Sequence, residues 1–257
     1  MTTIVLIAKE ALPGKVKTRL HPPLSLEAAA ELAAAAIADT LAAIAAVPAT
    51  RRVLLFDGAE VPPGSEEYDV MNQVAGDLDL RLGAMFDECE GPTVLIGMDT
   101  PQITSEMLAP MFEPWPPGVD AWFGPANDGG FWVLALANPD GDLVRGVPMS
   151  RDDTGSIQLQ RLRDAGLTVR ELPELTDVDT IDDAIAVARA APLTRFATVL
   201  SAHMPLDGHP ASAPDRVLTG PAPERASTST GTGTSTSTSA PTSTSTSHAH
   251  RTETAHS

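Results

Sequence analysis

Residues 3–20, TIVLIAKEALPGKVKTRL, place an apolar segment directly before a basic one. The run TIVLIA has no polar alternation, which is typical of a strand buried on both faces of a parallel sheet. Pro13 and Gly14 predict a turn after this strand, and glycine lets backbone amides come close to a ligand. We therefore expect an α/β fold whose first strand leads into a ligand-binding loop.

The basic residues of this loop stand out in an acidic chain. Lys15, Lys17 and Arg19 alternate, so in an extended loop they would share one side and could hold phosphate groups, with Lys9 nearby. The first 20 residues carry a net charge of +3, whereas the next 187 carry −20 and the whole chain −17. Neither GxxxxGK[ST] nor GxGxxG is present, and a solvated basic loop is the alternative. The clustering favours a site for a small anion.

The composition excludes several functional classes. The chain of 257 residues has 34 acidic and 17 basic side chains, and duplex binding needs a broad basic surface, so we expect no nucleic acid partner. Cys89 is the only cysteine, which rules out an intrachain disulfide. The apolar stretch 28–47 is mostly alanine and contains Glu31 and Asp39, each costing about 2.5 to 3.5 kcal/mol at mid-bilayer. We expect a soluble, cytoplasmic protein without a membrane partner.

Strand-like and helix-like segments alternate along most of the chain. Further strands are predicted at 52–56, 93–96, 120–123, 131–136 and 168–172, and helices at 25–47, 77–90, 104–111, 157–165 and 181–190. This alternation is typical of a mostly parallel, Rossmann-like α/β sheet with helices on both faces. Ligand sites in such sheets lie beyond the carboxyl ends of the strands. We predict one folded domain over residues 1–207.

Residues 208–257 differ from this domain in composition. Between 227 and 247, 17 of 21 residues are serine or threonine, which leaves little apolar surface to offset the ordering entropy. His248, His250 and His256 follow this stretch. We predict a disordered Ser/Thr-rich tail, which is either a solvated extension or a metal-binding or modified segment.

A carboxylate follows the third predicted strand. Asp99 comes after the apolar run 93–96 and is flanked by Gly97 and Pro101. Mg²⁺ and Mn²⁺ favour one or two carboxylates together with substrate phosphates, so Asp99 could hold such an ion or bind a ribose hydroxyl. It could equally cap the helix that follows.

The loop GPANDGGFW, residues 124–132, lies between two predicted strands. Asp128 before paired glycines could form an ordinary hairpin turn, since Asp-Gly favours hairpins. The loop is longer than a tight hairpin needs, and its proline and glycines indicate a shaped surface that admits a ligand. Both interpretations stay open from the residues alone.

The last acidic segment is DVDTIDD, residues 177–183. Asp179 or Thr180 could cap the following helix, and Asp182 and Asp183 would favour the positive end of that helix. The alternative is that Asp177 or Asp179 is a metal ligand. The segment thus carries a structural and a functional interpretation side by side.

Taken in order, AK-x3-PGKVKTRL, GMDTP, GPANDGGFW and DVDT resemble a family of bacterial proteins with the GT-A fold. The family is glycosyltransferase-like and largely uncharacterised, and some members are described as arsenosugar-type glycosyltransferases. The resemblance covers about residues 4–190. The first motif and the alanine-rich helix, with Asp39-Thr40 inside it, also resemble 2-phospholactate guanylyltransferases and other nucleotidyltransferases.

The resemblance implies a nucleotide bound with a divalent ion at the carboxyl edge of a nucleotide-diphospho-sugar transferase-like sheet. It implies that Lys15, Lys17 and Arg19 contact phosphates, that Asp99 binds metal or ribose, and that Asp128 lies near the acceptor or sugar. The sequence departs from the usual pattern around the acceptor side: Met98 precedes the aspartate of GMDTP, FW replaces a tyrosine pair, and 147–153 lacks a tryptophan. No DxD follows the third strand, because Thr100 and Pro101 come after Asp99.

These observations lead to a nucleotide-dependent transferase, foremost a glycosyltransferase that moves a sugar from a nucleotide-diphosphate sugar to a small acceptor. A nucleotidyltransferase acting on a phosphorylated small molecule is the first alternative, and a non-enzymatic nucleotide-sensing domain is the second. A homodimer is compatible with the sequence. The expected site consists of catalytic Asp128 and Asp99; phosphate-binding Lys9, Pro13, Gly14, Lys15, Lys17 and Arg19; acceptor- or sugar-binding Asn127, Gly129 and Gly130; and Asp99 and Asp179 as ligands of Mg²⁺ or Mn²⁺.

Overall fold

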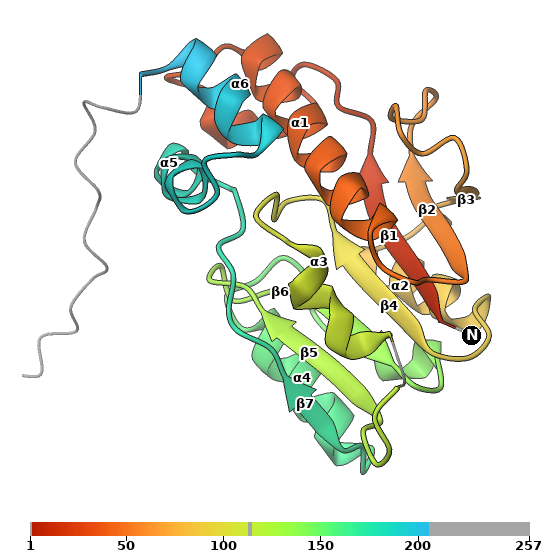
Figure 1. Ribbon diagram of the computed structural model, residues 1–257. Coiled ribbons are helices and arrows are strands. Elements are labelled where there is room, and N and C mark those ends of the chain that lie inside the picture. Colours follow the sequence, from red (N-terminus) through yellow and green to blue (C-terminus); the bar gives the residue numbers. More distant parts are fainter. Residues whose placement is uncertain (1, 113–114, 206–257) are drawn as a thin grey trace, which may run out of the picture. The chain divides into compact units, whose positions relative to one another are not determined.

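The computed structural model describes residues 2–112 and 115–205 and contains a seven-stranded sheet in the order β3-β2-β1-β4-β6-β5-β7 (Figure 1). The strands are β1 (Thr3–Lys9), β2 (Arg51–Asp57), β3 (Asp69–Asn72), β4 (Thr93–Gly97), β5 (Ala121–Pro125), β6 (Phe131–Leu136) and β7 (Val169–Glu171). Neighbouring strands pair in parallel except at β6, which runs antiparallel to β4 and β5. The predicted mostly parallel α/β sheet is confirmed.

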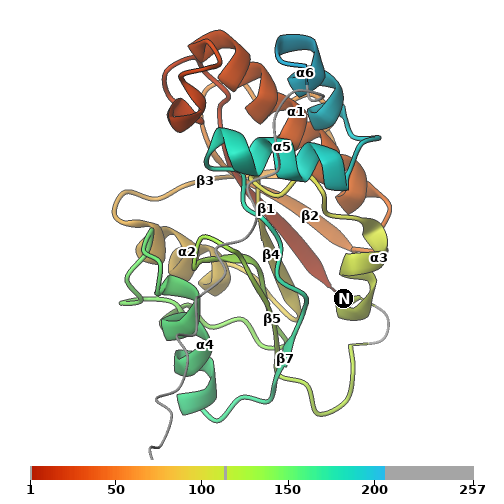
Figure 2. The same cartoon turned by 90° about the vertical axis from the view of Figure 1, so that its left-hand side faces the viewer.

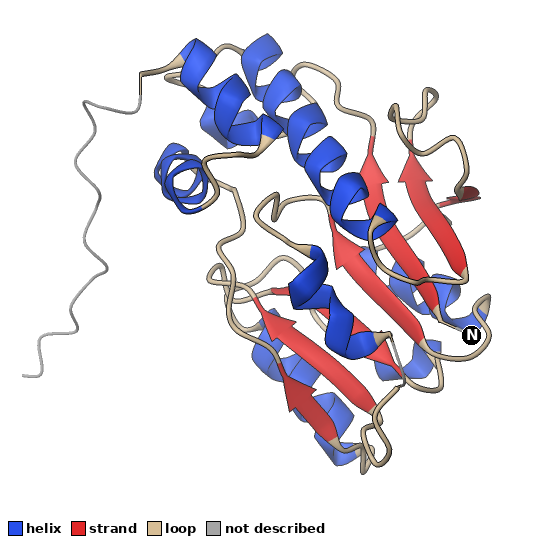
Figure 3. Ribbon diagram, viewed as in Figure 1, coloured by secondary structure: helices blue, strands red, loops and turns tan. Residues whose placement is uncertain are grey.

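Helices cover both faces of the sheet, as predicted (Figures 2 and 3). The α-helices are α1 (Leu26–Ala45), α2 (Leu78–Asp87), α3 (Ser105–Leu108), α4 (Thr154–Asp164), α5 (Ile181–Ala190) and α6 (Arg195–His203). Three short 3₁₀ helices are η1 (Thr18–Leu20), η2 (Ala109–Met111) and η3 (Gly141–Leu143). Buried side chains of α1 and α3 pack against one face, and those of α2 and α4 against the other.

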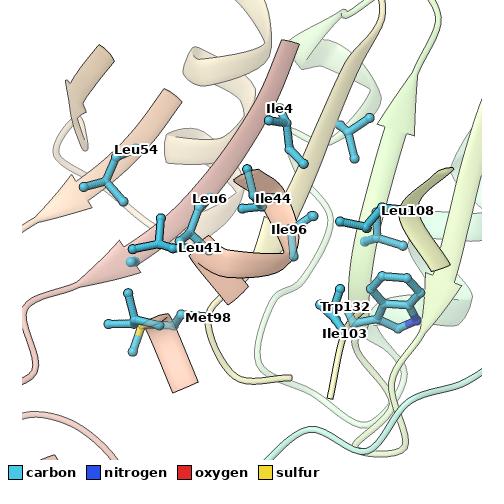
Figure 4. Packing of buried hydrophobic residues seen from close by; sticks show 14 of the residues in the cluster. Ile4, Leu6, Leu41, Ile44, Leu54, Ile96, Met98, Ile103, Leu108 and Trp132 are labelled. Carbon is cyan, nitrogen blue, oxygen red and sulfur yellow. The ribbon is translucent and has the colours of Figure 1, made fainter. Parts of the chain in front are cut away.

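Alternate residues of the first strand enter two different cores. Ile4 and Leu6 pack with Leu41 and Ile44 of α1 (Figure 4), whereas Val5 packs on the α2 side. This is why the run TIVLIA is apolar without interruption: both faces of β1 are covered. Each fully buried aliphatic side chain contributes about 1.5 to 3 kcal/mol, so β1 is a rigid base for the loop that follows it.

Helix α1 is long and apolar enough to span a membrane by length and composition, but 61% of its most apolar window is buried inside the fold. Its small alanine side chains let α5 and α6 pack closely against it. Asp39 is also committed to this packing, since its Oδ1 accepts from Arg195 N at 3.0 Å and its Oδ2 from Phe196 N at 2.8 Å. The helix is therefore part of the core, and Asp39 holds the N-terminus of α6.

One strand and one α-helix of the described residues were not among the predicted elements, nor were the short helices η1 and η3. Strand β3 is short and lies at the edge of the sheet, with mostly exposed residues and hence no apolar pattern. Helix α6 packs on α1 and α5 near the end of the described residues. The predicted boundary at 207/208 and the Ser/Thr-rich tail lie outside the described residues.

Candidate functional site

The carboxyl ends of β1, β4, β5 and β7 point to one edge of the sheet, because these strands run in the same direction. Four loops continue from these ends: residues 10–25, 98–104, 126–130 and 172–180. They contain most of the residues that the sequence predicted for the site. The sheet topology thus brings together residues that are far apart in the chain.

Lys17 lies at the centre of this edge. Its backbone is left-handed (φ 46°), and residues 18–20 form η1, so the loop is not the extended one that the alternating charges predicted. The Lys17 side chain is only 8% exposed, and its Nζ lies 2.5 Å from Asp99 Oδ1 and donates to the Val178 carbonyl oxygen. A buried ammonium needs such oxygen partners, since an unpaired buried charge is very costly.

The other basic side chains of the loop remain at the surface and do not form one row with Lys17. Arg19 Nη1 lies 2.8 Å from Asp179 Oδ2, and the Arg19 side chain is 75% exposed. The predicted turn is present, and Gly14 adopts a φ of 74°, which glycine tolerates without strain. The exposed residues of this loop include Lys9, Pro13, Gly14 and Lys15.

Four carboxylates form an acidic cluster beside Lys17: Asp99, Asp128, Asp177 and Asp179. Asp128, Asp177 and Asp179 each offer an oxygen within 4.8 Å of the others. Burial and the neighbouring Asp99 carboxylate raise the pKa of Asp177 to about 8, with Asp128 and Asp179 adding to the rise and Lys17 opposing it. Like charges held this close favour a protonated carboxyl unless a cation joins them.

The acidic cluster fits a divalent cation. Carboxylate oxygens are the ligands that Mg²⁺ and Mn²⁺ favour, and the neighbouring carboxylates add to the effect of burial in raising the pKa of Asp177. A bound ion would relieve this repulsion, because it is the largest local charge in such a site. Asp179, expected as a ligand, is part of the triad, whereas Asp99 pairs directly with Lys17.

The loop that carries Asp128 is tied to the loop after β7. Asn127 N donates to the Leu175 carbonyl oxygen at 3.0 Å, and Asn127 Oδ1 accepts from Asp177 N at 2.9 Å. Asp128 Oδ1 accepts from Gly130 N at 2.9 Å, while the Asp128 residue stays exposed. Asn127 therefore joins two loops of the site, and Asp128 presents its carboxylate at the surface of the edge.

Gly129 and Gly130 lie against the N-terminus of α4. Gly129 has a φ of 85°, and a Cβ at this position would lie 1.9 Å from the Asp152 carbonyl oxygen. Gly155 N donates to the Gly129 carbonyl oxygen at 2.7 Å. A Cβ on Gly155 would lie 2.3 Å from the Gly130 carbonyl oxygen. The double glycine thus has a packing role: only residues without side chains allow this contact between backbones.

The acidic segment at 177–183 divides into two functions. Thr180 Oγ1 accepts from Asp183 N at 3.3 Å and Asp183 Oδ2 accepts from Thr180 N at 2.8 Å, which is a capping box at the start of α5. The predicted cap at Thr180 is confirmed. Asp177 and Asp179, a few residues earlier, point into the acidic cluster.

Two cavities open beside the carboxyl ends of the strands, one on each face of the sheet. The first, of about 420 Å³, lies on the α1 side beyond β1 and β2, and Lys9, Leu12 and Phe56 are among its lining residues. The second, of about 200 Å³, lies on the side of α2 and α4, and both Asp128 and Asp177 line it. Two carboxylates of the acidic cluster therefore line the second cavity, and Lys9 with the start of the loop after β1 lines the first.

Sequence reasoning missed several residues around the second cavity. Arg151, Ser150 and Thr154 line it, as do apolar residues of α2. Arg151 and Thr154 belong to the segment VPMSRDDT. No predicted strand directly precedes this segment, so the sequence did not indicate that its polar residues lie at the carboxyl edge of the sheet. The signal that could have found them is the pair of glycines Gly129 and Gly155, which bring this segment against the Asp128 loop.

Comparison with known proteins supports the family resemblance. Residues 30–151 match a family described as an uncharacterised protein conserved in bacteria (DUF2064), which confirms the predicted resemblance to a largely uncharacterised bacterial family. No curated protein sequence matches the chain.

Three solved structures resemble this chain to different degrees, and the first of them shows its fold. An inferred nucleotide-diphospho-sugar transferase from Desulfovibrio desulfuricans G20 is 25% identical, with a TM-score of 0.67 over 78% of this chain and 94% of that chain. The 2-C-methyl-D-erythritol 4-phosphate cytidylyltransferase of Thermus thermophilus is 14% identical, with a TM-score of 0.47 over 75% and 100% of the two chains. Glucosyl-3-phosphoglycerate synthase of Mycobacterium tuberculosis, solved with Mn²⁺, UDP and glucosyl-3-phosphoglycerate, is 11% identical, with a TM-score of 0.42 over 79% of each chain. The chain has the nucleotide-diphospho-sugar transferase-like fold.

Proposed function

We propose that the chain is a nucleotide-dependent transferase that moves a sugar from a nucleotide-diphosphate sugar to a hydroxyl group of a small acceptor. The observation that carries this proposal is the meeting of a basic loop and an acidic cluster at the carboxyl edge of one sheet. A ligand that brings both phosphates and a divalent ion satisfies the two at once. The similarity to the Desulfovibrio protein supports the same class of donor.

The donor would lie along the loop after β1. Lys15 and Lys9 are exposed cations without a carboxylate partner among the ion pairs of the described residues, so they are free to meet the diphosphate. Arg19 would join them at the cost of its exposed pair with Asp179. The cavity of about 420 Å³ beside Lys9 has room for the nucleoside.

Asp99, Asp177 and Asp179 would hold Mg²⁺ or Mn²⁺ at this edge. Such an ion would supply electrostatic stabilisation of the departing diphosphate, a contribution of several kcal/mol in metal-assisted transfers. Lys17 keeps Asp99 and the loop after β7 in place through its contacts with Asp99 Oδ1 and the Val178 carbonyl oxygen.

Asp128 would accept the proton of the acceptor. Its carboxylate is exposed and lines the cavity of about 200 Å³, so an acceptor hydroxyl can reach it from that side. In the transfer, the acceptor oxygen forms a bond to the anomeric carbon as the bond from that carbon to the diphosphate oxygen breaks. The nucleoside diphosphate leaves with the electron pair, and the proton goes to Asp128.

Nucleotidyl transfer is the second candidate, because the exposed cations of the basic loop suit a triphosphate as well as a diphosphate. The products separate the two reactions. Incubation with NDP-sugars or NTPs, Mn²⁺ and a metabolite extract would give free NDP in glycosyl transfer and pyrophosphate in nucleotidyl transfer. Nucleotide binding without either product would support the sensing domain instead.

A pair of variants tests the phosphate site. In Lys15→Ala the dissociation constant of the bound nucleotide, measured by calorimetry with Mn²⁺, should rise about tenfold, the equivalent of one charge-assisted hydrogen bond. Arg163→Ala is the matched control, since it also removes one exposed cation. Arg163 lies on α4, away from the basic loop, and pairs with Glu171 of β7. Equal affinity in both variants and the wild type would remove Lys15 from the site.

A further inference from the structure

The cavity of about 200 Å³ beside Asp128 has walls of a different character from the rest of the site. It lies between the sheet and helices α2 and α4, on the face opposite α1. Its apolar lining comes from five different elements or loops. The large apolar side chains that line it and pack on this face are Ile7, Leu78, Leu82, Leu95, Phe131 and Met149.

These apolar side chains are incompletely covered by the protein itself. Leu82 and Leu95 are buried on this face of the sheet, with exposed fractions of 3% and 2%. Ile7, Leu78, Phe131 and Met149 are only partly buried, although all four pack against the core on this face. Concave apolar surface left open in this way is typical of a binding pocket for an apolar group.

The charges around the cavity disfavour a phosphate. Asp128 lines the cavity, and its exposed carboxylate would repel an anion. Arg151, the one basic residue among its described lining residues, is held by Asp153, with both nitrogens of the pair 2.8 Å from carboxylate oxygens. Hydrogen-bonding capacity is therefore concentrated at Asp128, and the inner wall offers apolar contact.

We propose that this cavity binds the apolar body of the acceptor, and that the acceptor is an uncharged alcohol carrying one ring or a branched alkyl group. This rests on the proposed function, in which Asp128 receives the hydroxyl proton. The size follows from the volume: a dry engineered cavity of about 150 Å³ binds benzene, so the slightly larger space here suits a ring with a hydroxymethyl group. The hydroxyl end lies toward Asp128 and the ring toward Leu82 and Leu95.

The test uses benzyl alcohol as the probe on the full-length protein. Binding is followed by the methyl NMR signal of Met149, which lines the cavity, with the exposed Met107 on α3 as internal reference. We expect the Met149 signal to shift on titration while Met107 stays constant. Glycerol 3-phosphate, which has hydroxyls but carries an anion, should produce no shift at Met149.

Leu78→Trp fills the cavity from its half-buried edge and should weaken benzyl alcohol binding at least tenfold. Leu80→Trp is the matched control on the same helix, because Leu80 is 45% exposed and does not line the cavity. Met149→Phe, with benzyl alcohol binding measured by calorimetry, serves as a second filling variant if Leu78→Trp fails to fold. Unchanged affinity in a folded filling variant, or tighter binding of glycerol 3-phosphate than of benzyl alcohol, would overturn the proposal.

Nucleotide binding separates this inference from the proposed function. UDP and GDP with Mn²⁺ should bind the wild type, Leu78→Trp and Leu80→Trp equally, because the cavity lies on the other face from the basic loop. If nucleotides bind but benzyl alcohol does not, the acceptor inference fails and the proposed function stands. If benzyl alcohol binds the cavity and no nucleotide binds anywhere, the proposed function fails and the pocket takes an apolar alcohol for another purpose, which contradicts its assignment to an acceptor.

Discussion

Two groups of carboxylates look alike in the sequence and differ in their surroundings. At the corner formed by α1, α5 and α6, Asp39 and Asp183 accept hydrogen bonds from backbone amides at helix N-termini. At the strand edge, Asp99, Asp177 and Asp179 lie beside other carboxylates and Lys17. A carboxylate that is satisfied by amides serves the fold, whereas carboxylates that face one another still require a cation.

The segment DVDTIDD contains both kinds of carboxylate within seven residues. Asp183 is fixed by the capping box of α5, and Asp177 is raised in pKa by burial and by its acidic neighbours. Residue type and spacing did not distinguish them. Their hydrogen-bond and charge partners distinguish them. Measurements of stability and of ligand binding therefore separate the carboxylates at the corner from those of the acidic cluster.

The largest effect is expected from Asp177→Asn. Turnover with Mn²⁺ should fall about 100-fold, the scale on which loss of a metal or transition-state contact acts. The melting temperature of the metal-free protein should stay the same or rise, because the folded wild type keeps Asp177 protonated at neutral pH at a free-energy cost that a neutral Asn does not have. Initial rates and thermal unfolding check both halves of this expectation. If the melting temperature fell with little loss of rate, the acidic cluster would have a structural role, like the carboxylates at the corner of α1, α5 and α6.

Asp39→Ala should produce the opposite pattern. It leaves the amides of Arg195 and Phe196 without their carboxylate partner, which should cost about 2 kcal/mol of unfolding free energy. For a domain of this size that is a fall of roughly 4 to 8 °C in melting temperature. Turnover at 20 °C should remain within about twofold of the wild type, because Asp39 is outside the site. Glu67→Ala, an exposed carboxylate on the surface, is the control and should leave both quantities unchanged.

The pH dependence of stability gives a sharper comparison. The pKa of Asp177 is about 8 in the folded protein, whereas an ordinary aspartate, as in the unfolded chain, has a pKa of 3.8. The folded state therefore holds this proton more tightly than the unfolded state. Ionisation of Asp177 therefore destabilises the fold progressively as the pH rises from about 4 to about 8. In EDTA, the melting temperature of Asp177→Asn should exceed that of the wild type at pH 8.5 by about 4 °C, equivalent to roughly 1 to 2 kcal/mol. This excess should shrink as the pH falls and disappear by about pH 4, and a constant difference across the range would contradict the assigned pKa.

The smallest effect is expected at Asp183. Asp183→Ala removes one half of the capping box of α5 and should cost about 1 kcal/mol, a fall of roughly 2 to 4 °C. The stabilisation produced by added Mn²⁺ should be unchanged in this variant. In Asp179→Asn, four residues earlier, that Mn²⁺ effect should shrink while the metal-free melting temperature stays close to the wild type. Similar behaviour of the two variants would mean that the segment has a single role.

The fold was largely predictable because its main strands are buried on both faces. Continuous apolar runs such as 3–8 and 93–96 leave little doubt between strand and loop, and their order with helices predicts a parallel sheet. The short edge strand β3 has exposed residues on both faces and so lacks that signal. The antiparallel insertion of β6 between β4 and β5 is a tertiary property that no local pattern encodes.

The candidate site was predictable residue by residue but not as an arrangement. Asp99, Asp128 and Asp179 could be selected because each follows a strand or lies in a shaped loop. The buried position of the Lys17 side chain could not be predicted. A left-handed backbone at lysine has no sequence signature, and this one depends on the oxygens that accept hydrogen bonds from the ammonium group. The raised pKa of Asp177 likewise arises from neighbours on other loops.

The backbone contact between Gly129 and Gly155 has a mechanical consequence. A hydrogen bond of 2.7 Å joins the two residues, and neither position has space for a Cβ. The loop that carries Asp128 and the N-terminus of α4 must therefore move as a single body. Any ligand that displaces the start of α4 will also move the Asp128 carboxylate. The position of that carboxylate therefore depends on the position of α4 as much as on its own loop.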